Sequence, residues 1–264
     1  MLAVKTYTAT ALPSTANSPK PSCRLNQINK SMRWQDITER AFLDQRKIDW
    51  MDSTLNKWAD AVATNFSSLK YVTLPDGVHA YAFEAEQIGP EFHKVVFALS
   101  EYDPDRIGYV DKTDSGYLIL SMNILQPEEI RHPNPTALAT KLRKFLRFFA
   151  HEFTHVLDSW RHKGKNVKGS SRYNNPADKP KYYNHSGETN AFYMEAVAQY
   201  LMKTKNASEE ERKVLVPQNF REFLPKILRM VDKNYLEHLT TQNKQKLIRR
   251  LSQLHGNLVK QIWK

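Results

Sequence analysis

Two histidines four residues apart, His151 and His155, are the side chains of this sequence best placed to do chemistry. They lie in an apolar-periodic stretch that predicts a helix, and side chains four apart on a helix project from the same face. Neutral imidazoles at that spacing can share one tetrahedral Zn²⁺. Glu152, directly after the first histidine, can reach a water on such an ion as a general base. The sequence therefore predicts a hydrolytic metal site on this helix.

Residues 151 to 155 read His-Glu-Phe-Thr-His. This His-Glu-x-x-His pattern resembles that of the zincin metallopeptidases. The resemblance implies one Zn²⁺ per chain, a peptide or protein substrate, and Glu152 as the catalytic general base. The structural alternative is an amphipathic core helix that carries two histidines without binding a metal.

A catalytic zinc site needs a third protein ligand. In the metzincin version of the motif a Gly and a His follow the second histidine, but this chain has Asp158 and Arg161 at those positions. His162 is displaced from the pattern by one residue. The gluzincin version takes its third ligand from a Glu on a later helix. By that resemblance we expect Glu188 to be the third metal ligand.

Two glutamates on the later helix compete for this role, since Glu195 follows Glu188 by seven residues and shares its face. Glu188 is favoured because a carboxylate in the first helical turn interacts well with the helix dipole. Glu195 is then expected to accept a hydrogen bond from a ligand histidine, a role for which Asp158 is a rival. The chain departs from the gluzincin pattern at Gly187, where an Asn usually precedes the ligand Glu. The plainer alternative makes Glu188 an ordinary first-turn carboxylate and Glu195 a solvated one.

Amide hydrolysis also needs a donor for the oxyanion that forms on the attacked carbonyl. Tyr182, Tyr183 and His185 are candidates because they lie close to Glu188 in the sequence. They belong to a long polar stretch, 163–186, that we expect to form a loop over the site.

The motif is expected to sit on one long helix that begins near Pro133 and Pro135. Its apolar residues recur at three- and four-residue steps and form one stripe, with the histidines on nearly the opposite side. Such a helix would lie between a core and a cleft. The stripe consists of Leu138, Leu142, Phe145, Phe149, Phe153, Val156 and Trp160.

The stretch before this helix is expected to be β-rich, with strands at 71–74, 79–85, 93–99, 108–110 and 116–122 separated by turn residues. In zincins an edge strand runs along the cleft, so by resemblance the last strand before the motif helix is the candidate edge. The pattern over 34–66 predicts two helices that break near Asp49. Residues 218–233 and 236–263 are expected to form two more helices.

The predicted fold class is therefore α+β and zincin-like, with a small twisted sheet, an edge strand and a central motif helix. A mainly α-helical C-terminal part follows. We expect a flexible basic arm over 1–33, a catalytic domain over 34–205, and a helical part over 206–264 that packs on it. The arm is rich in Ser, Thr, Pro and Ala and contains no acidic residue, a composition that favours disorder.

The composition limits the cellular compartments in which the protein is expected. The chain has 264 residues, of which 41% are hydrophobic, and no apolar run reaches the roughly 18 residues of a membrane span. Its N-terminus lacks the continuous apolar segment of a secretory signal peptide. Cys23 is the only cysteine, which fits the cytoplasm or another reducing compartment. An organellar or virion-associated location is the alternative expectation.

The net charge of +11 favours an acidic partner. Seven Lys and Arg residues fall between the second histidine and Glu188, and we interpret them either as an electrostatic rim for acidic substrates or as a solvated loop. The basic arm could likewise dock on a polyanion or an assembly partner. The seven residues are Arg161, Lys163, Lys165, Lys168, Arg172, Lys179 and Lys181.

Three functions follow, in descending order of support from the residues. The first is a zinc-dependent metallopeptidase that hydrolyses peptide bonds. The second is a structural or assembly protein, for example in a virion, on a zincin-like scaffold. The third is a nucleic-acid-associated peptidase, for which the sequence carries charge but no binding motif of known geometry.

Overall fold

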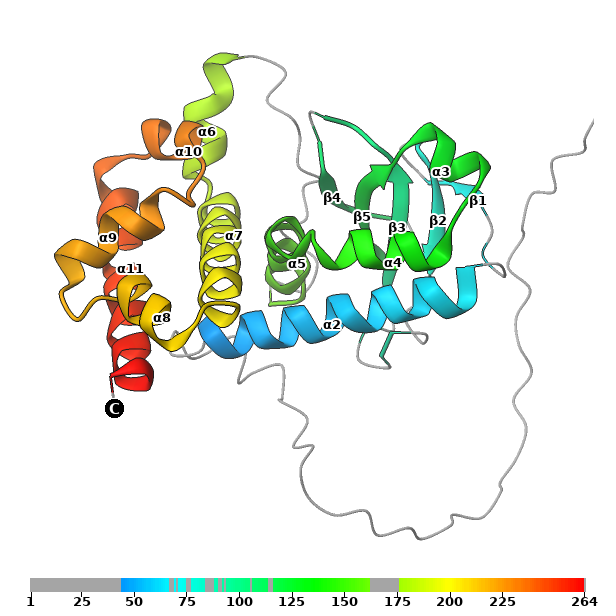
Figure 1. The fold of residues 1–264 in the computed structure, drawn as a ribbon. Helices are drawn as coiled ribbons and strands as arrows, with labels where there is room; N and C mark the ends of the chain where they lie inside the picture. Colours follow the sequence, from blue (N-terminus) through cyan, green and yellow to red (C-terminus); the bar gives the residue numbers. More distant parts are fainter. Residues whose placement is uncertain are drawn as a thin grey trace, which may run out of the picture.

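The structure, a computed structural model, describes residues 44–161 and 176–263, apart from short gaps at 67–68, 70, 75–76, 84–87, 90–91, 93, 105 and 114–115. The predicted arm at 1–33, the start of the predicted catalytic domain at 34–43 and most of the predicted basic loop lie outside these residues. The described chain is α+β, as predicted: a small sheet packs against helices, and a mainly helical part follows (Figure 1).

Five strands form one mixed sheet in the order β1-β2-β3-β5-β4. The strands β3 and β5 run parallel, while the other neighbouring pairs are antiparallel. Each predicted strand is present, with ends that differ by a few residues. The strands are β1 (Tyr71–Thr73), β2 (His79–Phe83), β3 (Val95–Glu101), β4 (Gly108–Lys112) and β5 (Leu118–Leu125).

The predicted edge strand is wrong, because β5 lies inside the sheet between β3 and β4. All eight residues of β5 are buried, and a near-continuous apolar run of this kind is typical of a strand that is covered on both faces. The strand β4 comes earlier in the chain but pairs outside β5, from Gly108 opposite Met122 to Lys112 opposite Leu118. The edge beside the motif helix is therefore β4.

The predicted motif helix is two helices, α4 (Pro135–Arg143) and α5 (Leu146–Arg161). The N–H of Lys144 bonds to the carbonyl of Lys141, and that of Phe145 to the carbonyl of Leu142. These short-range hydrogen bonds tighten the last turn of α4 and change the direction of the chain. They also give hydrogen-bond partners to carbonyl groups at the end of the helix. The apolar stripe continues across the turn, so periodicity alone did not reveal the break.

A single helix, α2 (Asp44–Asn65), replaces the two that we predicted around Asp49. Asp49 does not interrupt it, because its exposed carboxylate accepts a hydrogen bond from Gln45 one turn earlier. The helix runs across α4, α5 and α7 (Figure 1). Its buried face centres on Trp58, which packs against Phe97 and Phe149 at ring-centroid distances of 5.2 and 6.2 Å. This aromatic contact joins α2, the sheet and α5 in one core.

The C-terminal helices pack on α7 (Ser186–Lys205), which lies beside α5 (Figure 1). Apart from the first of these helices, in which no residue is buried, they contribute buried side chains to the same apolar cluster as the sheet and α2. The predicted helix over 236–263 begins later than expected, because a short helix precedes it. The helices after α7 are α8 (Glu209–Leu215), α9 (Phe220–Leu228), α10 (Lys233–His238) and α11 (Thr241–Ile262).

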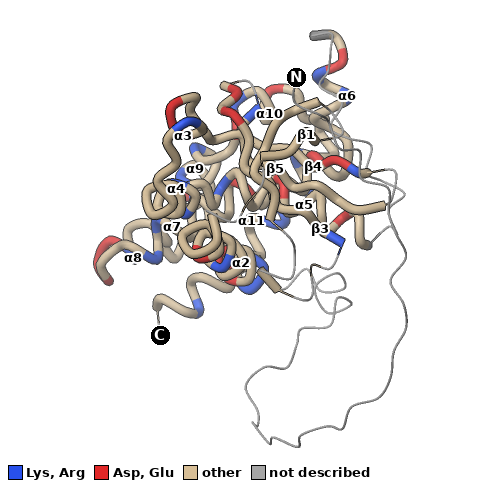
Figure 2. The backbone as a smooth tube through the Cα atoms, turned by 90° about the vertical axis from the view of Figure 1, so that its right-hand side faces the viewer, with Lys and Arg blue, Asp and Glu red and all other residues tan. Residues whose placement is uncertain are grey.

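Among the residues that the structure describes, no helix combines the length and the apolarity that crossing a membrane requires. Lys and Arg residues are spread over several helices and are interleaved with Asp and Glu (Figure 2).

Candidate metal centre

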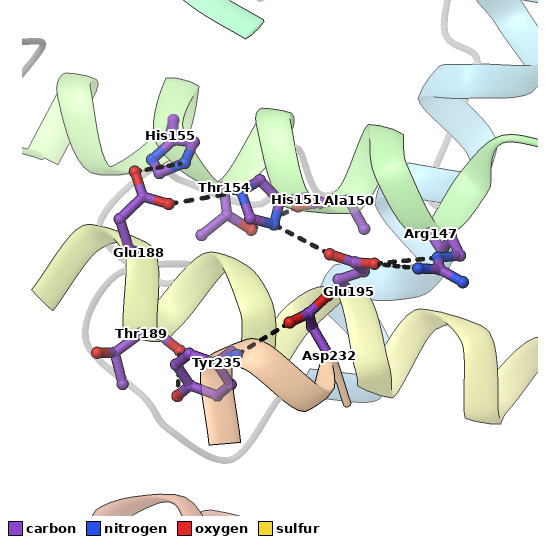
Figure 3. Close-up of polar contacts among 10 residues, drawn as sticks. All are labelled: Arg147, Ala150, His151, Thr154, His155, Glu188, Thr189, Glu195, Asp232 and Tyr235. Carbon is purple, nitrogen blue, oxygen red and sulfur yellow. Dashed lines mark hydrogen bonds and ion pairs between the residues drawn. The ribbon is translucent and has the colours of Figure 1, made fainter. Parts of the chain in front are cut away.

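The helices α5 and α7 lie side by side and bring the three predicted metal ligands together (Figure 3). Phe149 and Phe153 turn one face of α5 into the core, where both side chains are fully buried. The opposite face carries His151 and His155 toward α7. The ring of His151 meets the ring of Phe192 on α7 edge to face, with centroids 4.6 Å apart.

Glu188, in the first turn of α7, reaches both histidines. Its Oε1 lies 3.5 Å from Nε2 of His155, and its Oε2 lies 3.6 Å from Nε2 of His151 (Figure 3). One ligand atom from each of the three residues falls within 4.8 Å of the other two. Tetrahedral ligands at zinc–ligand distances of about 2.0–2.1 Å would be roughly 3.3 Å apart. The three side chains thus form a group that can hold a metal ion.

The carboxylate of Glu188 is unusual in its surroundings. The residue is only 6% exposed, and its Oε2 finds no hydrogen-bond partner among the described residues. Burial alone would raise the pKa of this carboxyl, but interactions with His151 and His155 outweigh it and hold the pKa well below its usual range. A buried anion whose two oxygens each face an imidazole, and one of whose oxygens lacks a hydrogen bond, fits a bound cation.

Glu195 approaches His151 from the other side of the ring. Its Oε2 lies 3.1 Å from Nδ1 of His151, and its Oε1 pairs with Arg147 at 2.7 Å (Figure 3). Burial would raise the pKa of Glu195, but the contact with His151 and the charge of Arg147 lower it. Glu195 therefore occupies the position of an acceptor behind His151, while Glu188 faces Nε2. Its rival Asp158 accepts a hydrogen bond from Asn190, at 3.4 Å.

The two histidines are held among carboxylates. Burial would lower the pKa of both imidazoles, but the interaction with Glu188 raises the pKa of each, and Glu195 raises that of His151 further. In the absence of a cation, a proton on either ring would therefore compensate the charge of Glu188.

Glu152 lies beside this group and against the sheet edge. Desolvation raises the pKa of its carboxyl, while the positive charges of His151 and His155 oppose that rise. On the strand side its neighbour is Gly108: a Cβ added there would lie 2.8 Å from Cγ of Glu152. The close packing of β4 on α5 thus fixes the space available to Glu152.

The three candidate oxyanion donors have separate positions. Tyr182 and Tyr183 lie on α6 (Lys179–Asn184), so this end of the predicted loop is helical. Burial and the charge of Glu188, with which its hydroxyl also interacts, raise the pKa of Tyr182 well above its usual value. Tyr183 is buried and packs on Phe192. His185 caps α7 by accepting a hydrogen bond from the N–H of Gly187, at 3.3 Å.

A cleft of about 520 Å³ opens over this group. Both histidines, Glu152 and Tyr182 line it, and so do residues outside the predicted site. Arg147 could have been found, since it precedes His151 by one helical turn. The approach of β4 to Glu152 has no signal in the sequence, because it depends on the order in which the strands pair in the sheet. The lining residues that were missed are Arg106, Ile107, Gly108, Arg147, Phe148, Phe192 and Asp232.

Comparisons of the chain with protein-family models, with curated proteins and with solved structures gave no match. Of the predicted basic rim, residues 163, 165, 168 and 172 lie outside the described residues. On α6, Lys179 is half-buried and Lys181 is exposed.

Proposed function

We propose that this protein is a zinc-dependent metallopeptidase with a zincin-like, gluzincin-type site. One observation carries the proposal: Nε2 of His151 and Nε2 of His155 converge on the Glu188 carboxylate, and both histidines line a cleft that Glu152 also lines. The two imidazoles come from one helix and the carboxylate from another, so only the packing of α5 on α7 forms the group.

His151, His155 and Glu188 would hold one Zn²⁺. Two neutral imidazoles and one carboxylate are a ligand set that catalytic zinc sites use, with a further position open to water or substrate. When bound, zinc supplies a Lewis acid that polarises a carbonyl and lowers the pKa of water towards about 7.

Glu152 acts as the general base in this proposal. Its carboxylate takes a proton from the attacking water and delivers that proton to the leaving amine. The raised pKa supports the first half of this role, because a carboxylate with a raised pKa is a stronger base than an exposed one.

Tyr182 is the best placed of the three candidate donors. Its pKa is raised by burial and by the charge of Glu188, so the phenol stays protonated and can donate a hydrogen bond to the oxygen of the tetrahedral carbon. Tyr183 is buried against Phe192, and His185 accepts a hydrogen bond at the start of α7.

The strand β4 provides a wall along which an extended peptide can lie. It is the last strand of the sheet on the side of α5, and Gly108 at its start adjoins Glu152. Backbone pairing of a substrate with an edge strand places successive peptide bonds in register without demanding a particular sequence. This explains how such a cleft could accept varied peptides.

Metal analysis combined with an activity assay tests the proposal. Purified protein should carry one zinc per chain, cleave a denatured protein substrate, lose both properties after treatment with a chelator, and regain them with added zinc. Crystals should show an anomalous zinc peak between His151, His155 and Glu188. Cleavage that survives complete removal of the metal would contradict the proposal.

A further inference from the structure

Arg106 borders the cleft two residues before the point where β4 meets Glu152. It is half-buried, and its guanidinium carbon lies 3.9 Å from the centroid of the Tyr109 ring. Stacking on an aromatic face orients a guanidinium but leaves the N–H donors at its edge available to a planar anion.

The other charged groups that line the cleft already have assigned contacts. Arg147 pairs with Glu195 at 2.7 Å, and Asp232 caps α10 by accepting a hydrogen bond from the N–H of Tyr235, at 2.9 Å. Within the described part of the chain, no carboxylate forms an ion pair with Arg106. A cation in a cleft that lacks an internal counter-ion is a site for an external carboxylate.

The backbone under Arg106 is fixed by a buried polar network. Asn123 on β5 donates from Nδ2 to the carbonyl of Arg106 at 2.5 Å and from its N–H to the carbonyl of Ile107 at 2.7 Å. The hydroxyl of Ser100 donates in turn to Oδ1 of Asn123, at 2.5 Å. Polar groups buried in the sheet therefore hold the backbone of this half-buried arginine in place at the cleft. This favours binding because little order must be gained when a ligand arrives.

Arg106 is also close enough to act on the reacting end of the cleft. It lines the same cleft as Glu152, and Gly108, two residues further along the chain, adjoins the Glu152 side chain. A carboxylate bound by Arg106 would thus lie near the bond that Glu152 helps to break.

We propose that Arg106 determines specificity by binding an Asp or Glu side chain of the substrate near the scissile bond, so that the enzyme prefers acidic peptides. This inference rests on the proposed peptidase function. The sequence alone had led us to expect that a basic loop would favour acidic substrates. The proposal assigns this preference instead to one arginine at the sheet edge.

Peptide binding tests this directly. The Glu152→Gln protein, loaded with zinc, is titrated with two pools of fluorescein-labelled peptides, randomised among neutral residues except for one central Glu or Gln. A charge-assisted pair should favour the Glu pool by about tenfold. Adding Arg106→Gln should abolish the preference and leave the Gln pool unaffected. Adding Arg131→Gln, on the exposed helix α3 (Pro127–Arg131), should preserve it.

Equal affinity for the two pools, no detectable binding of either, or a Glu preference that survives Arg106→Gln would each overturn the assignment. An equal loss of affinity for both pools in Arg106→Gln would also overturn it. The arginine would then shape the cleft without distinguishing a charged Glu side chain from a neutral Gln. If the unmutated protein fails to hydrolyse peptides but the Glu preference depends on Arg106, the peptidase proposal fails and the binding site for acidic side chains stands.

Discussion

Gly108 on β4 lies directly against Glu152 on α5: a Cβ atom added at position 108 would lie 2.8 Å from Cγ of Glu152 and 3.1 Å from the carbonyl oxygen of Ser121. Both distances are shorter than ordinary van der Waals contact. Only glycine therefore allows the edge strand to approach the proposed general base this closely, and β4 and Glu152 cannot be considered separately.

Gly108→Ala should displace the Glu152 side chain while the fold survives. Overpacking costs about 1–3 kcal/mol, and a misplaced catalytic group can cost up to roughly 100-fold in rate. We expect peptide hydrolysis to fall by about ten- to a hundredfold with zinc content unchanged. Gly256→Ala on α11 is the control, since its Cβ meets nothing within 4 Å. Activity of Gly108→Ala equal to that of the control would show that the contact has no role in catalysis.

Glu152→Gln should separate metal binding from hydrolysis. Glutamine keeps the size of the side chain but cannot accept a proton from water, so turnover should fall by about 10²–10⁴-fold. Zinc content, measured by mass spectrometry of the metal, should stay at one per chain. A variant that loses zinc and keeps its activity would remove Glu152 from the role of general base.

Glu188→Gln and Glu195→Gln should differ in their effect on zinc affinity. Glu188 faces Nε2 of both histidines, whereas Glu195 contacts Nδ1 of His151 from behind. Loss of an outer hydrogen-bond partner typically costs about 10–100-fold in metal affinity, and loss of a ligand costs more. Competition with a chromogenic chelator measures both constants. A larger loss in Glu195→Gln would reassign the third ligand.

Tyr182→Phe should lower the turnover number by about 100-fold with a smaller change in KM, because the hydrogen bond in question strengthens only as the oxyanion forms. Zinc content should be unchanged. Tyr117→Phe is a suitable control, since Tyr117 is 44% exposed and does not line the cleft. A Tyr182→Phe enzyme with the turnover of the unmutated protein would show that the oxyanion donor lies elsewhere.

Phe149→Ala should destabilise the fold by about 3–5 kcal/mol, because the side chain is fully buried between Trp58 and Phe153 and its removal leaves a cavity. Urea denaturation followed by circular dichroism measures the change. Val214→Ala serves for comparison, since Val214 is 66% exposed and should change stability by less than about 0.5 kcal/mol. Similar midpoints for the two variants would contradict the central place of α5 in the core.

Much of the fold could be predicted from the sequence because its signals are local. Alternating and apolar runs identified each strand, and the stripe on α5 identified the face that meets the core. Predictions failed where tertiary contacts decide. A hydrogen-bonded turn at Lys144 and Phe145 divides the motif helix without interrupting its apolar pattern. The strand β5 became internal because β4 folded back outside it.

The sequence by itself determined that His151 and His155 share one face of a helix next to Glu152, since the period of the α-helix fixes that geometry within a single segment. Only the tertiary structure decided that Glu188 faces the imidazole Nε2 atoms and Glu195 the Nδ1 atom. That choice depends on how α7 packs against α5, a relation between segments that no local pattern encodes. For the same reason, the approach of Gly108 to Glu152 and the place of Arg106 in the cleft became visible only in the folded chain.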